Sequence, residues 1–302
     1  MSTDVLGSSS WVTDGGLETD LIFHRGFDLP EFASFPLVDD EAGRTALLRY
    51  FREYDEIAAV AGAGVLLETP TWRANPDWGR VLGYDAAALD RVNQEAVALV
   101  RSIDAAAERC LTSGAVGPRG DGYQAEVIDP DEAAEYHAAQ VRSFAAAGAD
   151  LVHAMTMTGP NEAIGVVRAA RAAGVPVAVS FTVETDGVLP DGRTLRQAVT
   201  DVEAASPADW YGVNCAHPTH LVHALDGGEW QQHLRFLRPN ASTQSHEELD
   251  ASEVLDTGDV ELLRSSTATI RDLVPSVAVL GGCCGTDSSH VAALWGVPRR
   301  TS

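Results

Sequence analysis

Basic residues are scarce in this chain of 302 residues. It has 21 Lys and Arg against 44 Asp and Glu, which gives a formal net charge of -23. Because nucleic-acid binding needs clusters of Lys and Arg to neutralise phosphates, this deficit argues against a nucleic-acid partner. An acidic surface favours solubility, and its negative electrostatic field would also attract a small cationic substrate. The total charge does not distinguish these two interpretations.

Long apolar runs and cysteines are also rare. No stretch of 18 consecutive apolar residues occurs, so no membrane-spanning helix and no membrane partner are expected. The first residues have neither a basic segment nor an apolar core, so no secretory signal is expected. Four cysteines, two of them adjacent, are too few for a disulfide scaffold in a chain of this length. The cytoplasm is the expected compartment.

Apolar, β-branched runs alternate with longer Ala-rich stretches. The expected strands are Trp11–Asp14, Ala63–Glu68, Leu111–Val116, Asp150–Met155, Val175–Phe181, Trp210–Asn214, His233–Leu237 and Ser276–Leu280. The expected helices are Glu41–Ala61, Ala86–Arg109, Asp131–Ala147, Asn161–Ala173, Leu195–Ala205, a short one after Pro218, Val260–Asp272 and Ser288–Trp295. Eight strands, most followed by a helix, predict an α/β protein with a parallel sheet, closed as one (β/α)8 TIM barrel domain over residues 1–302.

An open, doubly wound sheet is the main alternative fold. The first strand lacks the G-x-G-x-x-G turn of a dinucleotide site, which weighs against it. Helix boundaries support the chosen segmentation, because Gly148 and Gly174 lie where helices are expected to stop and one helix begins just after Pro130. The polar stretch Arg238–Thr257 is expected to be a long loop after the seventh strand.

Chemically unusual residues lie at the ends of four of the predicted strands. The first ends in Asp14-Gly15-Gly16, the second in Glu68 to Arg73, the sixth in Asn214-Cys215, and the eighth in Gly281-Gly282-Cys283-Cys284-Gly285-Thr286. The loops that follow the strands of a barrel all meet on one face. We therefore expect these residues to form one active site.

The cysteines carry the most specific signal. Two adjacent thiols among glycines make a poor packing element, and Cys215 ends a nearby strand at a matching level. Zinc prefers tetrahedral sulfur and nitrogen ligands, so Cys215, Cys283 and Cys284 predict a zinc site with a fourth position open to water or substrate. Buried packing and a redox pair formed by the two adjacent cysteines are the alternatives, although redox pairs more often read Cys-X-X-Cys. Cys110, after an Ala-rich helix, is expected in the core.

These motifs resemble the homocysteine S-methyltransferase family, whose members use betaine, S-methylmethionine or methylfolate as donors. The motifs that carry the resemblance are Asp14-Gly15-Gly16, Trp72-Arg73-Ala74-Asn75, Gly117-Pro118, Ser180-Phe181-Thr182, Gly212-Val213-Asn214-Cys215, Pro239-Asn240 and Gly281-Gly282-Cys283-Cys284-Gly285-Thr286. The resemblance implies a zinc-containing (β/α)8 barrel with the three cysteines as zinc ligands and Asp14 in the site of the amino-acid thiol.

The chain departs from the family at two strand ends. Members usually have a glutamate at the end of the fourth strand that helps to hold the amino group of homocysteine, and Met155 stands there. In the second strand Pro70 replaces the usual Asn, and Trp72 is the aromatic residue. Carboxylates that could replace the glutamate are those of Glu68, Glu18 and Asp20. The acceptor is therefore homocysteine or a related thiol.

Other residues near the strand ends admit two interpretations each. Asp14 fits a substrate site or a helix cap. Trp72 and Trp11 would attract a methylated cation or pack at the rim. Ser180 and Asn214 fit hydrogen bonds to substrate or within the rim. The remaining polar candidates are His153, expected in the core, and His217 and His220, expected on a helix surface rather than as zinc ligands.

The predicted activity is the transfer of a methyl group to a zinc-bound thiol. A free alkyl thiol has a pKa near 8.5, and coordination to zinc deprotonates it at neutral pH. The donor would be a small sulfonium or ammonium compound such as S-methylmethionine, S-adenosylmethionine or betaine. A zinc hydrolase or lyase on the same barrel, or a non-catalytic metal- or thiol-binding protein, are the alternatives; the oligomeric state stays open.

Overall fold

Eight parallel strands pair in sequence order and close into a barrel in the computed structural model, which describes residues 4–120, 122–125, 128–252 and 254–298. The barrel closes because β8 pairs with both β7 and β1. The strands are β1 (Trp11–Thr13), β2 (Gly64–Glu68), β3 (Cys110–Val116), β4 (Leu151–Met157), β5 (Val177–Phe181), β6 (Trp210–Asn214), β7 (Leu234–Arg238) and β8 (Val279–Leu280). The predicted (β/α)8 barrel is confirmed.

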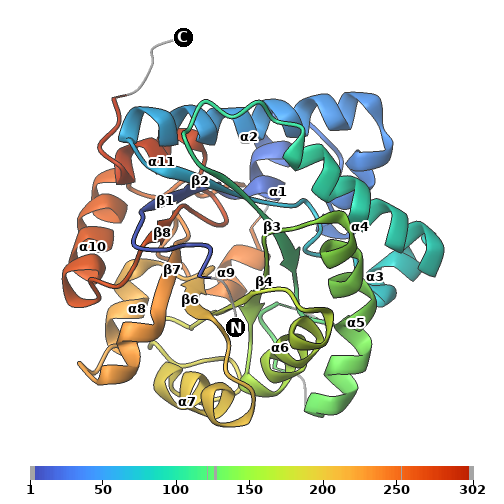
Figure 1. Cartoon of the computed structure of the whole chain (residues 1–302). Helices are drawn as coiled ribbons and strands as arrows, with labels where there is room; N and C mark the ends of the chain where they lie inside the picture. The colour runs from blue at the N-terminus through green and yellow to red at the C-terminus, as the bar shows by residue number, and fades with distance from the viewer. Residues whose placement is uncertain (1–3, 121, 126–127, 253, 299–302) are drawn as a thin grey trace.

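Helices surround the barrel as an outer ring (Figure 1). The α-helices are α1 (Leu17–Thr19), α2 (Glu41–Ala61), α3 (Pro76–Val81), α4 (Ala86–Arg101), α5 (Pro130–Ala147), α6 (Pro160–Ala173), α7 (Leu195–Ala205), α8 (Pro218–Ala224), α9 (His246–Asp250), α10 (Val260–Leu273) and α11 (Ser288–Leu294). Short 3-10 or π turns are η1 (Asp20–His24), η2 (Pro30–Phe32), η3 (Phe35–Asp39) and η4 (Glu229–His233). Within the described residues, no helix is both long and apolar enough to cross a membrane.

Local sequence explains where the long helices begin and end. The side chains of Asp40, Asp85 and Asp129 accept hydrogen bonds from backbone amides in the first turns of α2, α4 and α5. Gly148 and Gly174 adopt left-handed conformations directly after α5 and α6, as predicted from their spacing. Because Asp129 is the cap, α5 begins at Pro130, one residue earlier than expected.

The prediction for the end of α4 is wrong. The helix stops at Arg101 instead of continuing to Arg109. The carboxylate of Asp55 accepts hydrogen bonds from the amides of Ala106 and Ala107, which holds this Ala-rich segment outside the helix. As a result, Cys110 begins β3 and is exposed, so its expected place in the core is also wrong.

The segment after β7 contains a helix that the sequence analysis did not place. Ser245 and Glu248 form a capping box, in which each side chain binds the other's backbone amide, and α9 begins there at His246. The expectation of a long irregular loop over residues 238–257 is therefore wrong for its central part. This helix brings His246 to the carboxyl end of the barrel.

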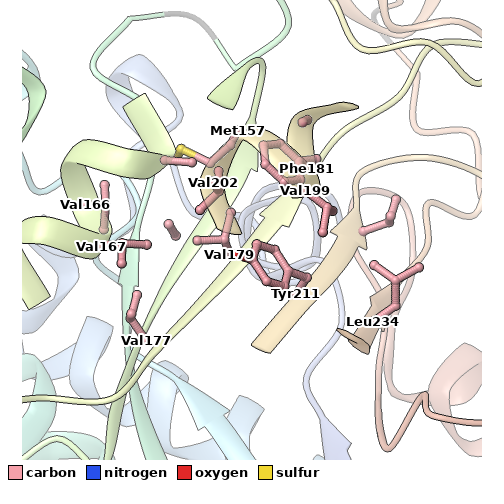
Figure 2. Close-up of a cluster of buried hydrophobic side chains, with 14 of the residues drawn as sticks. Met157, Val166, Val167, Val177, Val179, Phe181, Val199, Val202, Tyr211 and Leu234 are labelled. Atoms are coloured by element: carbon pink, nitrogen blue, oxygen red, sulfur yellow. The ribbon is translucent and has the colours of Figure 1, made fainter. Parts of the chain in front are cut away.

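The two faces of each strand pack differently. The outward side chains of β5, namely Val177, Val179 and Phe181, pack with residues of α6 and α7 in a large buried cluster (Figure 2). Inside the barrel, a smaller cluster that includes Leu6, Trp11, Leu66, Leu151, Trp210, Phe236 and Val279 fills the amino end. The barrel is therefore a packed core rather than a pore. Its carboxyl end, where the strands finish, is where polar groups gather.

Candidate active site

Three cysteine sulfurs meet at the carboxyl end of the barrel. Cys215 directly follows β6, and Cys283 and Cys284 follow β8 after two glycines. Their Sγ atoms all lie within 4.8 Å of one another, and in the described part of the chain this is the only such group of His, Cys, Asp or Glu side chains. The Sγ atoms of Cys215 and Cys284 are 4.0 Å apart. The structure therefore brings together the three cysteines that the sequence singled out.

Two of these cysteines form a disulfide, which the sequence analysis did not predict. The bond joins Cys215 to Cys283, whose Cα atoms are 5.4 Å apart. This separation lies within the usual range for disulfides because the ends of β6 and β8 are close on the barrel rim. The redox alternative considered from the sequence was the adjacent pair, so the structure corrects the partners.

Glycines let the loop after β8 approach its neighbours. A Cβ atom on Gly281 would lie 2.5 Å from the carbonyl oxygens of Thr13 and Asp14, and Gly285 has a left-handed φ of 77°. Backbone hydrogen bonds then fix the loop: the amide of Gly282 donates to Asp14 and that of Cys283 to Pro239. The loop is thus joined to the ends of both β1 and β7.

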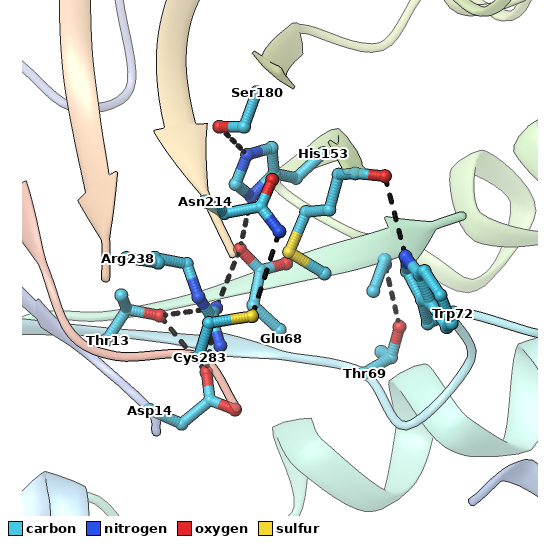
Figure 3. A network of polar contacts seen from close by, with 12 residues as sticks. Thr13, Asp14, Glu68, Thr69, Trp72, His153, Ser180, Asn214, Arg238 and Cys283 are labelled. Atoms are coloured by element: carbon cyan, nitrogen blue, oxygen red, sulfur yellow. Dashed lines mark hydrogen bonds and ion pairs between the residues drawn. The ribbon is translucent and has the colours of Figure 1, made fainter. Parts of the chain in front are cut away.

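A buried charge network lies beside the sulfurs (Figure 3). The guanidinium of Arg238 is 3.1 Å from Oδ1 of Asp14 and 3.5 Å from Oε1 of Glu68. The same Glu68 oxygen is 2.6 Å from Nδ1 of His153, whose Nε2 is 2.7 Å from Oγ of Ser180. Arg238 also donates to the carbonyl oxygens of Gly15 and Gly282. One guanidinium therefore ties together the ends of β1, β2, β7 and β8.

Burial and neighbouring charges shift these carboxyl groups in opposite directions. Burial raises the pKa of Asp14, although the facing Arg238 opposes this rise. Burial alone would also raise the pKa of Glu68, but His153 and Arg238 hold this pKa below its usual value. Burial likewise raises the pKa of Glu18, although the hydroxyl of Ser34 donates to it. Glu68 is therefore the carboxylate of this network that stays ionised most readily.

Two neighbouring cavities open at this end. The first, called here the sulfur cavity, is lined by the three cysteines together with Asp14, Glu68, Met155, Asn214 and Arg238. The second, called the adjacent cavity, is lined by Phe23, Leu249, Val254 and Asp256 among others. Thr19, Phe32, Trp72, Tyr123 and Cys284 line both. The shared Cys284 and the aromatic side chains therefore stand where two ligands would meet.

Most predicted site residues line the sulfur cavity. They are Asp14, Gly15, Gly16, Glu68, Trp72, Asn214, Cys215, Cys283 and Cys284. Asp14 does not cap the following helix, because the residue in that position is Gly16 and no side chain caps α1. Glu18 also lines the cavity, whereas Asp20 instead pairs with Arg25.

Other expectations are wrong or need refinement. Ser180 does not line the cavity; it is fully buried beneath His153, whose expected place in the core is confirmed. Trp11 lies in the apolar cluster at the opposite end of the barrel and donates its indole N–H to Leu6, so it has no place near a ligand. His217 is buried as the cap of α8 rather than lying on a helix surface, and His220 is half-buried with Nε2 near the carbonyl of Thr243.

Several residues of the site were missed from the sequence, among them Arg238, Thr156 and Tyr123. Arg238 is the last residue of β7. A charged residue in an otherwise apolar, buried strand was the sequence signal that could have identified it. Thr156 contacts Asn214, which accepts from its amide at 2.7 Å and donates to its hydroxyl at 2.8 Å. The Tyr123 hydroxyl lies 3.8 Å from Sγ of Cys284, but its loop carries no sequence signal that we could recognise.

Backbone strain is concentrated at this site. The described non-glycine residues with positive φ are Glu31, Phe32, Thr156 and Cys215. The last three line the sulfur cavity. Each such conformation costs about 1–3 kcal/mol and persists only where surrounding contacts enforce it. The side chains at the carboxyl end are therefore held in positions that the chain would not adopt unaided.

One pair of sulfurs already has the spacing of zinc ligands. A Zn–S distance of about 2.3 Å gives sulfurs about 3.8 Å apart, close to the 4.0 Å between Cys215 and Cys284, whereas the bonded sulfurs of Cys215 and Cys283 would have to separate. A metal requires all three groups as thiolates, so the disulfide and metal-bound forms exclude one another. The three cysteines, once reduced, are therefore a candidate metal site.

Comparison with known proteins adds a family and a fold. Residues 11–296 match the family model described as homocysteine S-methyltransferase. The chain is similar to the solved structure of the homocysteine methyltransferase MmuM from Escherichia coli in its oxidized form, with 22% identity and a TM-score of 0.71. For the metallated form of MmuM these values are 23% and 0.69, and in both cases 96% of each chain is covered. No curated protein matches the chain.

Proposed function

The chain belongs to the homocysteine S-methyltransferase family, and we propose that it moves a methyl group from a small sulfonium or ammonium donor to homocysteine or a related amino-thiol. The observation that carries the proposal is the meeting of three cysteine sulfurs in a cavity that also holds buried carboxylates. Sulfur ligands suit the activation of a thiol, and carboxylates suit the recognition of an amino group.

We assign the metal position to Cys215, Cys283 and Cys284, with zinc as the ion. When bound, zinc lowers the pKa of an acceptor thiol and keeps it as a thiolate at neutral pH. Binding requires reduction of the bond between Cys215 and Cys283. A reducing compartment, the cytoplasm, suits such a site. MmuM has been solved in both an oxidized and a metallated form, which supports the assignment of two such states to this site.

We assign the amino group of the acceptor to Glu68, with Asp14 beside it. Oε2 of Glu68 is buried, and its neighbour across the strand pair is the hydroxyl of Ser113, which helps to lower the pKa of Glu68 from too far away for an ordinary hydrogen bond. The carboxyl groups of Asp14 and Glu68 both lie beside Arg238, so an incoming ammonium group would meet two acceptors there. Met155 lines the same cavity without a charge, so Glu68 takes over the role that a carboxylate on β4 would have.

The adjacent cavity is the proposed place of the methyl donor. Its aromatic side chains Phe32, Trp72 and Tyr123 also line the sulfur cavity, so a donor there lies next to the acceptor. Aromatic faces attract methylated cations such as sulfonium or quaternary ammonium groups. Placing thiolate and methyl group in line contributes up to about 7–11 kcal/mol in well-oriented systems. The protein's part in the reaction is therefore mainly alignment.

The direct test is a transfer assay with reduced, zinc-loaded protein. Homocysteine is combined in turn with S-methylmethionine, S-adenosylmethionine and betaine, and the product is identified by mass. We expect methionine with at least one donor, and loss of this product in Cys284→Ala. Absence of methyl transfer to homocysteine and to other amino-thiols, in protein shown to contain zinc, would contradict the proposal.

A further inference from the structure

The backbone carbonyl oxygen of Cys215 is held by three side chains at once. Thr182 Oγ1 and Asn240 Nδ2 each donate to it at 3.2 Å, and His246 Nε2 lies 2.6 Å away. All three side chains are buried. A carbonyl oxygen has two lone pairs, and one partner is enough to compensate its burial. Three donors from separate parts of the chain therefore do more than satisfy this oxygen; they fix its position.

His246 is itself fixed on two sides. Its Nδ1 lies 2.8 Å from Oε1 of Glu184, and its ring stacks on Tyr123 with centroids 4.1 Å apart. A carbonyl oxygen and a carboxylate oxygen can only accept, so Nε2 donates to Cys215 and Nδ1 donates to Glu184. The Glu184 carboxylate thus orients the ring, as second partners of histidine commonly do. Tyr123 extends the contact to the sulfur of Cys284.

The backbone of Cys215, whose carbonyl oxygen accepts these hydrogen bonds, has a strained conformation. Cys215 has a φ of 56°, in the left-handed region that non-glycine residues rarely adopt. If the donors were removed, the residue would relax toward an ordinary conformation. Its Sγ would then turn away from the sulfurs of Cys283 and Cys284, because rotation about the backbone moves the side chain with it.

We propose that Thr182, Asn240 and His246, the last oriented by Glu184, form a clamp that positions the sulfur of Cys215 for metal binding. The proposal rests on the metal site proposed above. The members of the clamp are positioning residues, because they act through Cys215. This clamp also gives a function to α9, whose first residue is His246.

The test measures zinc affinity of reduced protein by competition with a chromophoric chelator. We expect His246→Ala to weaken zinc binding about 10–100-fold, the usual effect of losing a second partner of a metal ligand. His246→Gln keeps an N–H group within reach of the carbonyl and should stay within about threefold of the wild type. Cobalt(II) in place of zinc should show weaker sulfur charge-transfer bands in His246→Ala, because one sulfur is displaced.

The chain offers a matched control in His290. This histidine also lies between a carboxylate and a carbonyl, with Nδ1 2.7 Å from Asp287 and Nε2 3.0 Å from the oxygen of Thr257. No cysteine carbonyl is involved. His290→Ala should therefore lower the melting temperature without weakening zinc binding.

A second variant keeps the test decisive if His246→Ala does not fold. Thr182→Val preserves side-chain shape and removes one donor, so it should weaken zinc binding by a smaller factor. Wild-type affinity in Thr182→Val and in folded His246→Ala, or an equal loss in His290→Ala, would overturn the clamp. A wild-type protein that binds no zinc would instead overturn the metal site itself, so the two failures are distinguishable.

Discussion

The two ends of the barrel interior differ in chemistry although the same strands build both. Near the amino end the inward side chains include Leu66, Leu151 and Phe236. Two residues further along the same strands, the inward side chains are Glu68, His153 and Arg238. Since alternate residues of a strand share a face, each strand changes from apolar to polar within one step. The apolar end closes and stabilises the barrel, and the polar end is the proposed ligand site.

Backbone strain follows the same division. Cys215, Thr156 and Phe32 have left-handed conformations and line the sulfur cavity. The carboxyl end thus combines buried charge with strain, and both cost folding free energy. We infer that packing at the amino end and in the outer helices contributes the folding free energy that offsets this cost. Mutations at the two ends should therefore have separable effects.

The largest effect on function is expected from Cys284→Ala. Loss of one of three thiolates should lower zinc affinity by at least about a hundredfold, more than the loss of a second partner would. Zinc content should fall from about one per chain toward zero, measured by atomic emission on reduced protein. The melting temperature of the metal-free protein should stay close to that of the metal-free wild type. Full zinc content in Cys284→Ala would contradict the assignment of this ligand.

Leu66→Ala tests the opposite end. The side chain is fully buried in the apolar cluster, so its loss should lower the free energy of unfolding by about 2–5 kcal/mol. Denaturant titration measures this change. Zinc stoichiometry at 25 °C should not change, because Leu66 touches none of the cysteines. A variant of normal stability that has lost zinc would show that the two ends are not separable.

Glu68→Gln tests the charge network. A hydrogen bond to a charged group contributes about 1.5–3 kcal/mol, so KM for homocysteine should rise roughly 10–100-fold. The matched control substrate is 4-mercaptobutyrate, which lacks the amino group and should react equally with both proteins. An equal loss with both thiols would mean that Glu68 supports the fold of the site rather than the amino group.

The last prediction concerns reactivity rather than function, at a thiol of the amino end. Although Cys110 is exposed as a residue, the packing around its thiol, with Asp55 and Asp150 nearby, raises its pKa to about 11. Since the thiolate is the reactive form, alkylation of Cys110 at pH 8 should be slower than that of a free cysteine by roughly a hundredfold, despite its exposure. Mass spectrometry after timed alkylation measures the rate, and raising the pH toward 11 should restore it. Rapid alkylation at pH 8 would show that the pKa of Cys110 is not raised.

The sequence predicts the barrel and the cysteine trio because both depend on local patterns. Alternating strands and helices define the fold, and a glycine-flanked pair of thiols at one strand end, with a third thiol at another, defines the site. The end of α4 was missed because a distant carboxylate, Asp55, binds the amides of an Ala-rich segment that favours helix. Contacts of this kind join residues far apart in the chain, and propensity cannot show them.

The same reason explains what was missed in the site. Arg238 is important because it reaches the ends of three other strands, and His246 because it reaches the carbonyl of Cys215. A capping pattern at Ser245 and Glu248 would have placed α9 in advance. Nothing in the sequence alone indicates which way its first side chain points.

X-ray absorption at the zinc edge tests the central claim most directly. In reduced, zinc-loaded protein we predict three sulfur ligands and one lighter atom at ordinary zinc–ligand distances. Addition of homocysteine should change the coordination to four sulfurs, as the acceptor thiol takes the fourth position. Fewer than three sulfurs before addition, or no change after it at saturating homocysteine, would contradict a metal-bound thiol as the centre of this site.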